Sequence, residues 1–188
     1  MTPDELFAAT TAEFPKLEKA TVEVKGYLTL RLPAAGDLLP VVTWLKGRGF
    51  RYLDMVTATD YKGPVDAKGF VSDPNPNGFL PAGARPEIEV PAAAAGFPYR
   101  DAFEAVYCLS HLEEKLKIFL KLELPREGAK VPSLAGLFEA ADWQEREVYD
   151  LLGIVFEGHP NLTKILTPDF IQGHPLRKDY VHVPDRFD

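Results

Sequence analysis

One stretch near the middle of the chain alternates apolar and other side chains so regularly that it limits the possible folds. From Leu116 to Leu124 every even position is Leu or Ile, while the odd positions are Lys, Phe, Lys and Glu. This alternation is typical of a β-strand with one buried face and one mostly solvated face. A similar alternation from Phe103 to Leu109 precedes it, and residues 110–114 join the two. The sequence therefore predicts an antiparallel pair of strands.

The first 61 residues predict a helix, a hairpin, a second helix and a strand. Thr2-Pro3-Asp4-Glu5 combines an N-cap, a proline at the first helical position and a capping-box glutamate. Apolar residues alternate between Ala20 and Leu32, which favours a β-hairpin. Asp37 to Lys46 has helical spacing, and Phe50 to Tyr61 is typical of a strand. The order is therefore α, β, β, α, β.

A further helical region precedes Gly153. Ser133 can cap one stretch, and a second stretch begins at Asp142 and ends at Gly153, a suitable residue after a helix end. If the two stretches are collinear, Glu145 falls on their apolar stripe. We therefore expect an α+β fold, with a mixed, mainly antiparallel sheet flanked by helices.

Residues 61–100 differ in composition from the rest of the chain. They hold seven of the 17 prolines, five of the 14 glycines and a run of four alanines. So many helix and strand breakers indicate a surface insertion, either a disordered loop or a segment that orders against a partner. We expect a single domain over residues 1–188, with this Pro/Gly/Ala-rich insertion and an extended C-terminal tail.

The charge and the cysteine count exclude several classes of function. With 21 basic and 28 acidic residues the net charge is −7, which disfavours nucleic acid and anionic membrane surfaces as partners. No apolar run reaches the roughly 20 residues of a membrane span, and the first residues do not resemble a signal peptide, so we expect a cytoplasmic protein. The single cysteine, Cys108, excludes a four-cysteine cluster built from this chain alone.

Charged side chains are dense in the last quarter of the chain. Glu145 requires a partner if it is buried, Arg146 can pair with Asp150 four residues later, and Glu147 leaves an excess of negative charge. We expect a two-pronged contact of Arg177 with a carboxylate to fix the tail onto the helix. The nearest basic candidates are Lys164, Arg177 and Lys178. An ion-pair clasp is favoured over acid–base catalysis, and an interface role is the remaining alternative.

Two His-Pro pairs, His159-Pro160 and His174-Pro175, raise the possibility of a metal site. Imidazole is a common ligand, and nearby acids such as Asp169 could complete the set. However, the histidines are fifteen residues apart, and no helical spacing places them on one face. A residue before proline favours extended backbone, so we expect each His-Pro to shape a turn with its ring bonded to the backbone.

The last quarter of the chain also carries an ordered set of motifs. EREVYDLLGIVF at 145–156 is followed by GHPNL at 158–162 and by GHPLRKDY at 173–180. This combination resembles the signature of the C subunit of the proton-pumping NADH:quinone oxidoreductase, respiratory complex I. The residues that we select as interface or structural residues are Glu145, Arg146, Glu147, Asp150, His159, Pro160, His174, Arg177, Lys178 and Asp179.

The resemblance implies a non-catalytic subunit of the hydrophilic arm, attached peripherally at the cytoplasmic side of the cell membrane. Its implied partners are the large subunit that lines the quinone cavity and the subunit that holds the terminal iron–sulfur cluster. FMN and the clusters would belong to other subunits, with no cofactor in this chain. The complex transfers electrons from NADH to quinone and couples this transfer to proton translocation.

Two alternatives stay open at this point. The chain could serve an equivalent arm of a related membrane-bound hydrogenase or of another quinone- or ferredoxin-linked oxidoreductase. It could also be a free-standing metal-dependent hydrolase that uses His159, His174 and nearby acids.

Overall fold

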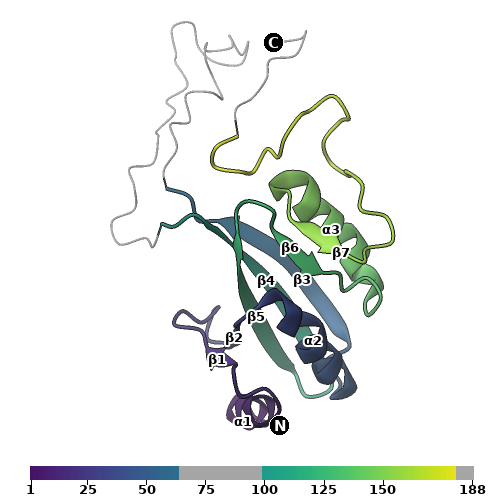
Figure 1. The fold of residues 1–188 in the computed structure, drawn as a ribbon. Coiled ribbons are helices and arrows are strands. Elements are labelled where there is room, and N and C mark those ends of the chain that lie inside the picture. Colours follow the sequence, from purple (N-terminus) through teal and green to yellow (C-terminus); the bar gives the residue numbers. More distant parts are fainter. Residues whose placement is uncertain (64–98, 181–188) are drawn as a thin grey trace, which may run out of the picture.

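The computed structural model describes residues 1–63 and 99–180. Figure 1 shows three main helices beside a twisted sheet. The elements in chain order are α1 (Pro3–Glu13), β1 (Glu18–Lys19), β2 (Leu28–Leu32), the 3-10 helix η1 (Ala35–Asp37), α2 (Leu38–Gly47), β3 (Tyr52–Asp60), β4 (Ala102–His111), β5 (Leu116–Pro125), β6 (Lys130–Pro132), α3 (Glu139–Leu152) and β7 (Val155–Glu157).

The main sheet of the described residues has the strand order β1-β2-β5-β4-β3. Strands β4 and β5 are antiparallel, with Tyr107 opposite Leu120 and Leu109 opposite Ile118, which confirms the predicted pair. Strand β3 pairs antiparallel with β4, whereas β2 pairs parallel with β5. The short strands β6 and β7 form a separate parallel pair. The predicted mixed, mainly antiparallel α+β architecture is thus confirmed.

All three helices contribute to one hydrophobic core on one face of the sheet. The alternating residues of β5, including Leu120, point into this core, where they meet Leu6 of α1, Val41 of α2 and Val148 of α3. The capping box predicted for α1 is present, because Thr2 and Glu5 exchange side-chain-to-backbone hydrogen bonds. The periodicity of the sequence therefore corresponds to burial, since every second strand residue faces the helices.

The other face of the sheet carries a smaller apolar cluster among charged side chains. Val106, Cys108 and Phe119 are largely buried there. Lys121 and Glu104 form an ion pair on this face, with 3.3 Å between Nζ and Oε1. This face is therefore mainly polar, as the lysines and glutamate of the β5 alternation predict.

Two sequence expectations need correction. The hairpin begins earlier than residue 20, because β1 at Glu18–Lys19 pairs with β2. Residues 133–138 do not form a helix collinear with α3, because Phe138 is extended and α3 begins at Glu139. The physical reason is that the Ser133 hydroxyl and the Leu134 N–H bind the Glu145 carboxylate, which turns the chain before the helix starts.

Other predictions fall partly beyond the described residues. Most of the expected insertion, residues 64–98, lies outside them, and so does the tail after residue 180. In the described part of the chain, no helix has both the length and the apolar character needed to span a membrane.

The turn after α2 depends on a glycine. Gly49 has a φ of +96°, and a Cβ atom there would lie 2.3 Å from Nε2 of His111. The His111 ring itself packs edge-on against Phe50, with 5.5 Å between ring centroids. Both the backbone conformation and the close approach of the imidazole therefore require glycine at this position.

We predict opposite effects for two neighbouring glycines. Gly49→Ala should lower the free energy of unfolding by about 1 to 3 kcal/mol, because it strains a left-handed residue and displaces His111. Gly47→Ala should instead raise it by about 0.5 to 1 kcal/mol, because Gly47 is helical and nothing lies within 4 Å of an added Cβ. Urea unfolding of the purified variants measures both changes, and equal stability of the two would contradict this account.

Candidate interaction site

The chain from residue 158 to residue 180, called the C-terminal segment here, lies along α3 without forming a helix or strand. Three residues of the segment contact the helix in order. His159 contacts Asp142, Thr163 contacts Arg146, and Arg177 contacts the last turn of α3. Successive parts of the segment therefore meet successive turns of the helix. In Figure 1 it is the yellow-green to yellow trace beyond β7.

Asp150 is the main attachment point of this segment on α3. Its Oδ2 atom accepts hydrogen bonds from the backbone N–H groups of Ile165, Leu166 and Thr167 at 2.8 to 3.0 Å, and its Oδ1 atom accepts one from the Thr167 hydroxyl. Burial opposes ionisation, but these donors outweigh it and lower the pKa of Asp150 to about 2. A buried carboxylate thus holds three consecutive backbone amides.

Arg146 does not pair with Asp150, so that prediction was wrong. Its guanidinium donates to the backbone oxygens of Thr163 and Lys164 and to the Thr163 hydroxyl. The C-terminal segment lies against this side of the helix and satisfies the two side chains separately. It offers oxygens to the arginine and N–H groups to the aspartate, which leaves no need for a direct ion pair.

Both His-Pro pairs occur in turns, as predicted. His159 accepts a hydrogen bond from the Asn161 N–H at Nδ1, which leaves Nε2 to donate to the carbonyl oxygen of Asp142. His174 donates from Nδ1 to the carbonyl oxygen of Asp150. The two rings therefore fasten the C-terminal segment to the backbone of α3.

Arg177 contacts the end of α3 rather than a carboxylate, which corrects the expected two-pronged pair. Its Nε donates to the carbonyl oxygen of Leu152 at 2.7 Å, and one terminal nitrogen contacts the carbonyl oxygen of Arg126 at 3.4 Å. Carbonyl groups in the last turn of a helix lack intrahelical partners and carry partial negative charge, so they attract a guanidinium.

Gly153 makes room for this contact. It has a φ of +77° and follows the last residue of α3, as predicted for a helix stop. A Cβ atom at this position would lie 2.5 Å from the His174 ring and 2.9 Å from Arg177. The glycine therefore ends the helix and also admits the two side chains that attach the C-terminal segment there.

Glu145 finds neutral partners in place of the expected cation. It is fully buried, and its carboxylate accepts from the Ser133 hydroxyl and the Leu134 N–H, each at 2.6 Å. Burial raises the pKa of Glu145 above its usual range, although these two donors partly oppose the shift. Glu145 therefore connects α3 to the chain before it and does not hold the C-terminal segment.

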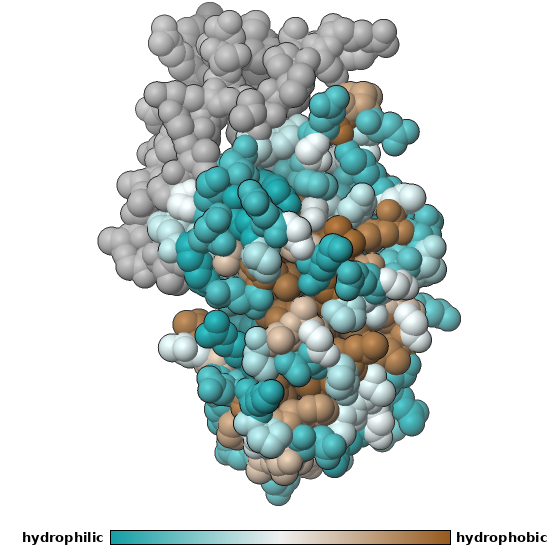
Figure 2. Space-filling view, in the orientation of Figure 1, coloured by the Kyte–Doolittle hydropathy of each residue, from teal (hydrophilic) through white to brown (hydrophobic). Residues whose placement is uncertain are grey.

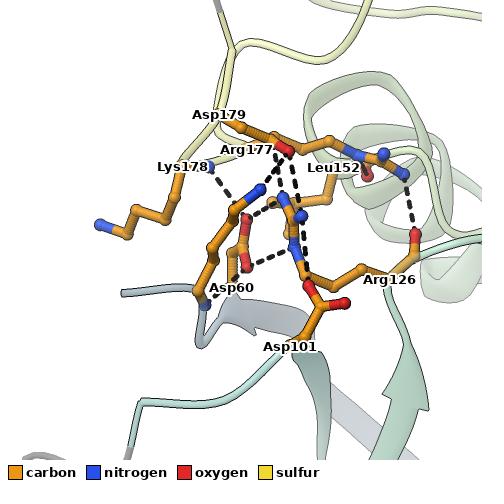
Figure 3. A network of polar contacts seen from close by, with 8 residues as sticks. Asp60, Asp101, Arg126, Leu152, Arg177, Lys178 and Asp179 are labelled. Carbon is orange, nitrogen blue, oxygen red and sulfur yellow. Dashed lines mark hydrogen bonds and ion pairs between the residues drawn. The ribbon is translucent and has the colours of Figure 1, made fainter. Parts of the chain in front are cut away.

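A two-pronged arginine contact does exist, but it is made by Arg126 (Figure 3). Arg126 binds both carboxylate oxygens of Asp60 at 2.9 Å, and it also contacts Asp179 at 2.6 and 3.0 Å. Lys178 donates its backbone N–H to Asp60, and Lys62 binds Asp179. This Asp60–Arg126–Asp179 network therefore joins the sheet to the end of the C-terminal segment.

The network is largely removed from solvent at its centre. The side chains of Arg126 and Asp60 are only 6% and 1% exposed, and the Arg126 guanidinium lies 5.6 Å from the centroid of the Phe103 ring. Although burial opposes it, hydrogen bonding to Arg126 and to backbone N–H groups lowers the pKa of Asp60. Arg126 also lowers the pKa of Asp179 well below its usual range.

Sequence reasoning missed Asp60 and Arg126 as partners of the tail. A signal was present, because Asp60 ends β3 and Arg126 directly follows β5, and both strands pair antiparallel with β4. The ends of β3 and β5 therefore meet at the same edge of the sheet. Opposite charges placed there were detectable once the strand order was known.

The remaining predicted site residues, Glu147, Pro160 and Lys178, were expected at an interface. Glu147 and Pro160 are exposed. Large apolar side chains are also exposed in this region, namely Trp143, Leu166, Phe170 and Leu176, at 58 to 64%. Figure 2 shows brown side chains interspersed with teal ones over the region of α3 and the C-terminal segment. The structure thus presents apolar groups on a backbone held by buried polar contacts.

The candidate metal ligands within residues 1–63 and 99–180 do not come together. No group of three or more His, Cys, Asp or Glu side chains in these ranges is arranged for a metal ion. Both ring nitrogens of His159 are engaged with backbone. Burial raises the pKa of the Cys108 thiol to about 11, which makes this cysteine a poor nucleophile or ligand.

Comparison with known proteins identifies the family. The family described as "Respiratory-chain NADH dehydrogenase, 30 Kd subunit" matches residues 33–185. The chain belongs to this family. The match includes β3, β4, β5, α3 and the whole C-terminal segment, so the contacts described above lie within the family's domain.

Several curated relatives resemble part of the chain. The NADH-quinone oxidoreductase C subunit of Salinispora arenicola is 45% identical over 97 residues, which cover 50% of this chain and 40% of that protein. Subunit 5 of the Thermus thermophilus NADH-quinone oxidoreductase is 47% identical over 88 residues, which cover 44% of this chain and 42% of that protein. An Aeromonas salmonicida protein named as a C/D subunit is 45% identical over 93 residues, which cover 50% of this chain but only 15% of that protein. The matched region thus spans less than half of each of these relatives.

Solved structures agree with the architecture. A fragment described as trypsin-resistant Nqo5 has a TM-score of 0.54 and 25% identity, covering 85% of this chain and 98% of that one. A chain from an archaeal membrane-bound sulfane sulfur reductase has a TM-score of 0.64 and 22% identity, and the match covers 98% of this chain and 94% of that one. The second likeness concerns the fold alone.

We predict that Arg126→Ala lowers the free energy of unfolding by about 3 to 5 kcal/mol, because it leaves the buried Asp60 carboxylate without its cation. Arg126→Lys should recover only part of this loss, since lysine lacks the planar fork. Denaturant unfolding measures both changes.

As a control, Arg31→Ala removes an exposed ion pair with Glu123 and should lower the free energy of unfolding by less than about 1 kcal/mol. A loss as small for Arg126→Ala would contradict the role given to the network.

We also predict a pH-dependent contribution of Asp150. Its folded-state pKa of about 2 lies below the ordinary value of 3.8, so its contribution is complete above about pH 4 and is lost as pH falls towards 2. Asp150→Asn should therefore cost about 2 kcal/mol at pH 7, and the difference from wild type should shrink below pH 4. Urea unfolding across this pH range measures it.

The exposed carboxylate of Glu147 on the same helix provides the control for this experiment. Glu147→Gln should change stability by no more than about 0.5 kcal/mol at any of these pH values. A constant difference between Asp150→Asn and wild type from neutral to strongly acidic pH would show that the charge of Asp150 is not responsible.

Proposed function

We propose that this chain is a non-catalytic structural subunit of the peripheral arm of NADH:quinone oxidoreductase. In this assembly electrons pass from NADH through FMN and iron–sulfur clusters in other subunits to quinone, coupled to proton translocation. The family match over residues 33–185 is the observation that carries the proposal. The names of the curated relatives, all subunits of quinone oxidoreductases, support it.

The geometry of the C-terminal segment supports a docking role for this subunit. Leu166, Phe170 and Leu176 are more than half exposed, while the backbone between them is attached to α3 and to Arg126. Because the backbone is already ordered, binding a partner would cost little conformational entropy. Apolar side chains displayed in this way suit a protein–protein interface better than a solvated surface.

We propose as partners the large subunit that lines the quinone cavity and the subunit that holds the terminal cluster. The relative named as a C/D subunit supports direct contact with a second subunit, because its name joins two subunits and the matched region forms only 15% of its length. Joining two polypeptides in one chain favours their lying side by side in the assembly. The subunit would then be attached to the cytoplasmic side of the cell membrane through the complex alone.

We assign no redox group to this chain. FMN and the clusters belong to the partners in this account, and Cys108 is the chain's single cysteine. The contribution of the chain is mechanical and electrostatic. It keeps neighbouring subunits in position around the quinone cavity.

An affinity-tagged chain expressed in its native host tests this proposal. Detergent-solubilised membranes should yield the tagged chain together with the other subunits and with NADH:quinone reductase activity, while the purified chain alone should be colourless and inactive. Recovery of hydrogenase subunits in their place would favour the alternative arm. A tagged chain that returns alone, or that shows flavin or cluster absorbance by itself, would refute the proposal.

A further inference from the structure

Helix α3 has three faces with different surroundings. Ala141, Glu145, Val148 and Leu152 are buried towards the core. Asp142, Arg146 and Asp150 contact the C-terminal segment. The third face is formed by Glu139, Trp143 and Glu147, which are spaced four residues apart and are all exposed. We call these three residues the outward stripe.

Trp143 dominates the outward stripe. Its side chain is 64% exposed, more than any other large aromatic side chain within residues 1–63 and 99–180. Tryptophan is enriched among the residues that carry most of the binding energy in protein interfaces. The core face of α3 is formed by other residues, so the large aromatic surface of Trp143 faces away from the core.

The Trp143 ring contacts a side chain that is itself fixed by the C-terminal segment. The Arg146 guanidinium lies over it, with 5.5 Å between Cζ and the ring centroid. That guanidinium is itself fixed by three hydrogen bonds to oxygens of Thr163 and Lys164. The C-terminal segment therefore orients the tryptophan through Arg146, which reduces the entropy lost on binding.

The charge of the outward stripe defines the chemistry of a partner. Glu139 and Glu147 lie one turn before and one turn after Trp143, and neither forms an ion pair within residues 1–63 and 99–180. Two unneutralised carboxylates beside an aromatic ring favour a surface with positive charge around an apolar pocket. They also disfavour an anionic lipid surface, which repels acidic groups.

We propose that Trp143 inserts into an apolar pocket, edged by Lys or Arg side chains, on another subunit of the same complex. Glu139 and Glu147 pair with those cations and set the orientation of the contact. This inference rests on the proposed function, because it names a contact through which this subunit joins the assembly. It makes the outward stripe an interface distinct from the exposed leucines and phenylalanine of the C-terminal segment.

The test compares variants of the tagged chain in cells that lack the native copy. Trp143→Ala should reduce the recovered complex at least tenfold, and Glu139→Lys combined with Glu147→Lys should do the same. Leu112→Ala, which truncates a side chain 58% exposed just beyond β4, is the matched control and should leave recovery unchanged. Melting temperatures of the purified full chains should agree within about 2 °C, because an exposed side chain contributes little to the fold.

The outcomes separate this inference from the proposed function. If the wild-type chain and Trp143→Ala recover the same amount of complex, the inference is overturned and the proposed function stands. Failure of the wild-type chain to recover any other subunit would instead refute the proposed function. A photo-crosslinking amino acid at position 143 should couple to a peptide that contains Lys or Arg beside apolar residues. Coupling to lipid would overturn the inference.

Discussion

The Asp60–Arg126–Asp179 network joins the main sheet to the end of the C-terminal segment. Asp60 ends an edge strand, Arg126 follows the strand two places away, and Asp179 comes from the far end of the C-terminal segment. Because Arg126 and Asp60 are almost fully buried, each would be costly without the other. The network therefore fixes the end of the C-terminal segment against the sheet, while other contacts attach the rest of the segment to α3.

Helix α3 organises the segment by satisfying its backbone. Asp150 accepts three consecutive N–H groups, Arg146 donates to two carbonyl groups, and the two histidines bind helix carbonyls. A chain without helix or strand normally leaves such groups to water. Here side chains of the helix take that role, so that an irregular segment acquires a defined shape. Its apolar side chains are then displayed outward, which suits a subunit whose role is to hold others in place.

Sequence reasoning succeeded where a pattern is local. Three such patterns were predicted correctly, because each depends on neighbours within a few residues. They are the strand alternation from Leu116 to Leu124, the capping box at Thr2 and the helix end at Gly153. The family resemblance was also readable, since its motifs lie in order between residues 145 and 180. The roles of the two His-Pro pairs followed from the backbone preference before proline and were confirmed.

Charge pairing was where sequence reasoning failed. It assigned Arg146 to Asp150 and Arg177 to a carboxylate by proximity and charge, whereas both arginines bind backbone carbonyls. The two-pronged contact belongs to Arg126, 66 residues away from Asp60 along the chain. The amino-acid sequence by itself determined the β4–β5 pair, the start of α1, the end of α3 and the family. Only the tertiary structure decided which charges meet, because a charged group pairs with whatever folding brings within about 3 Å, and strand order controls that distance.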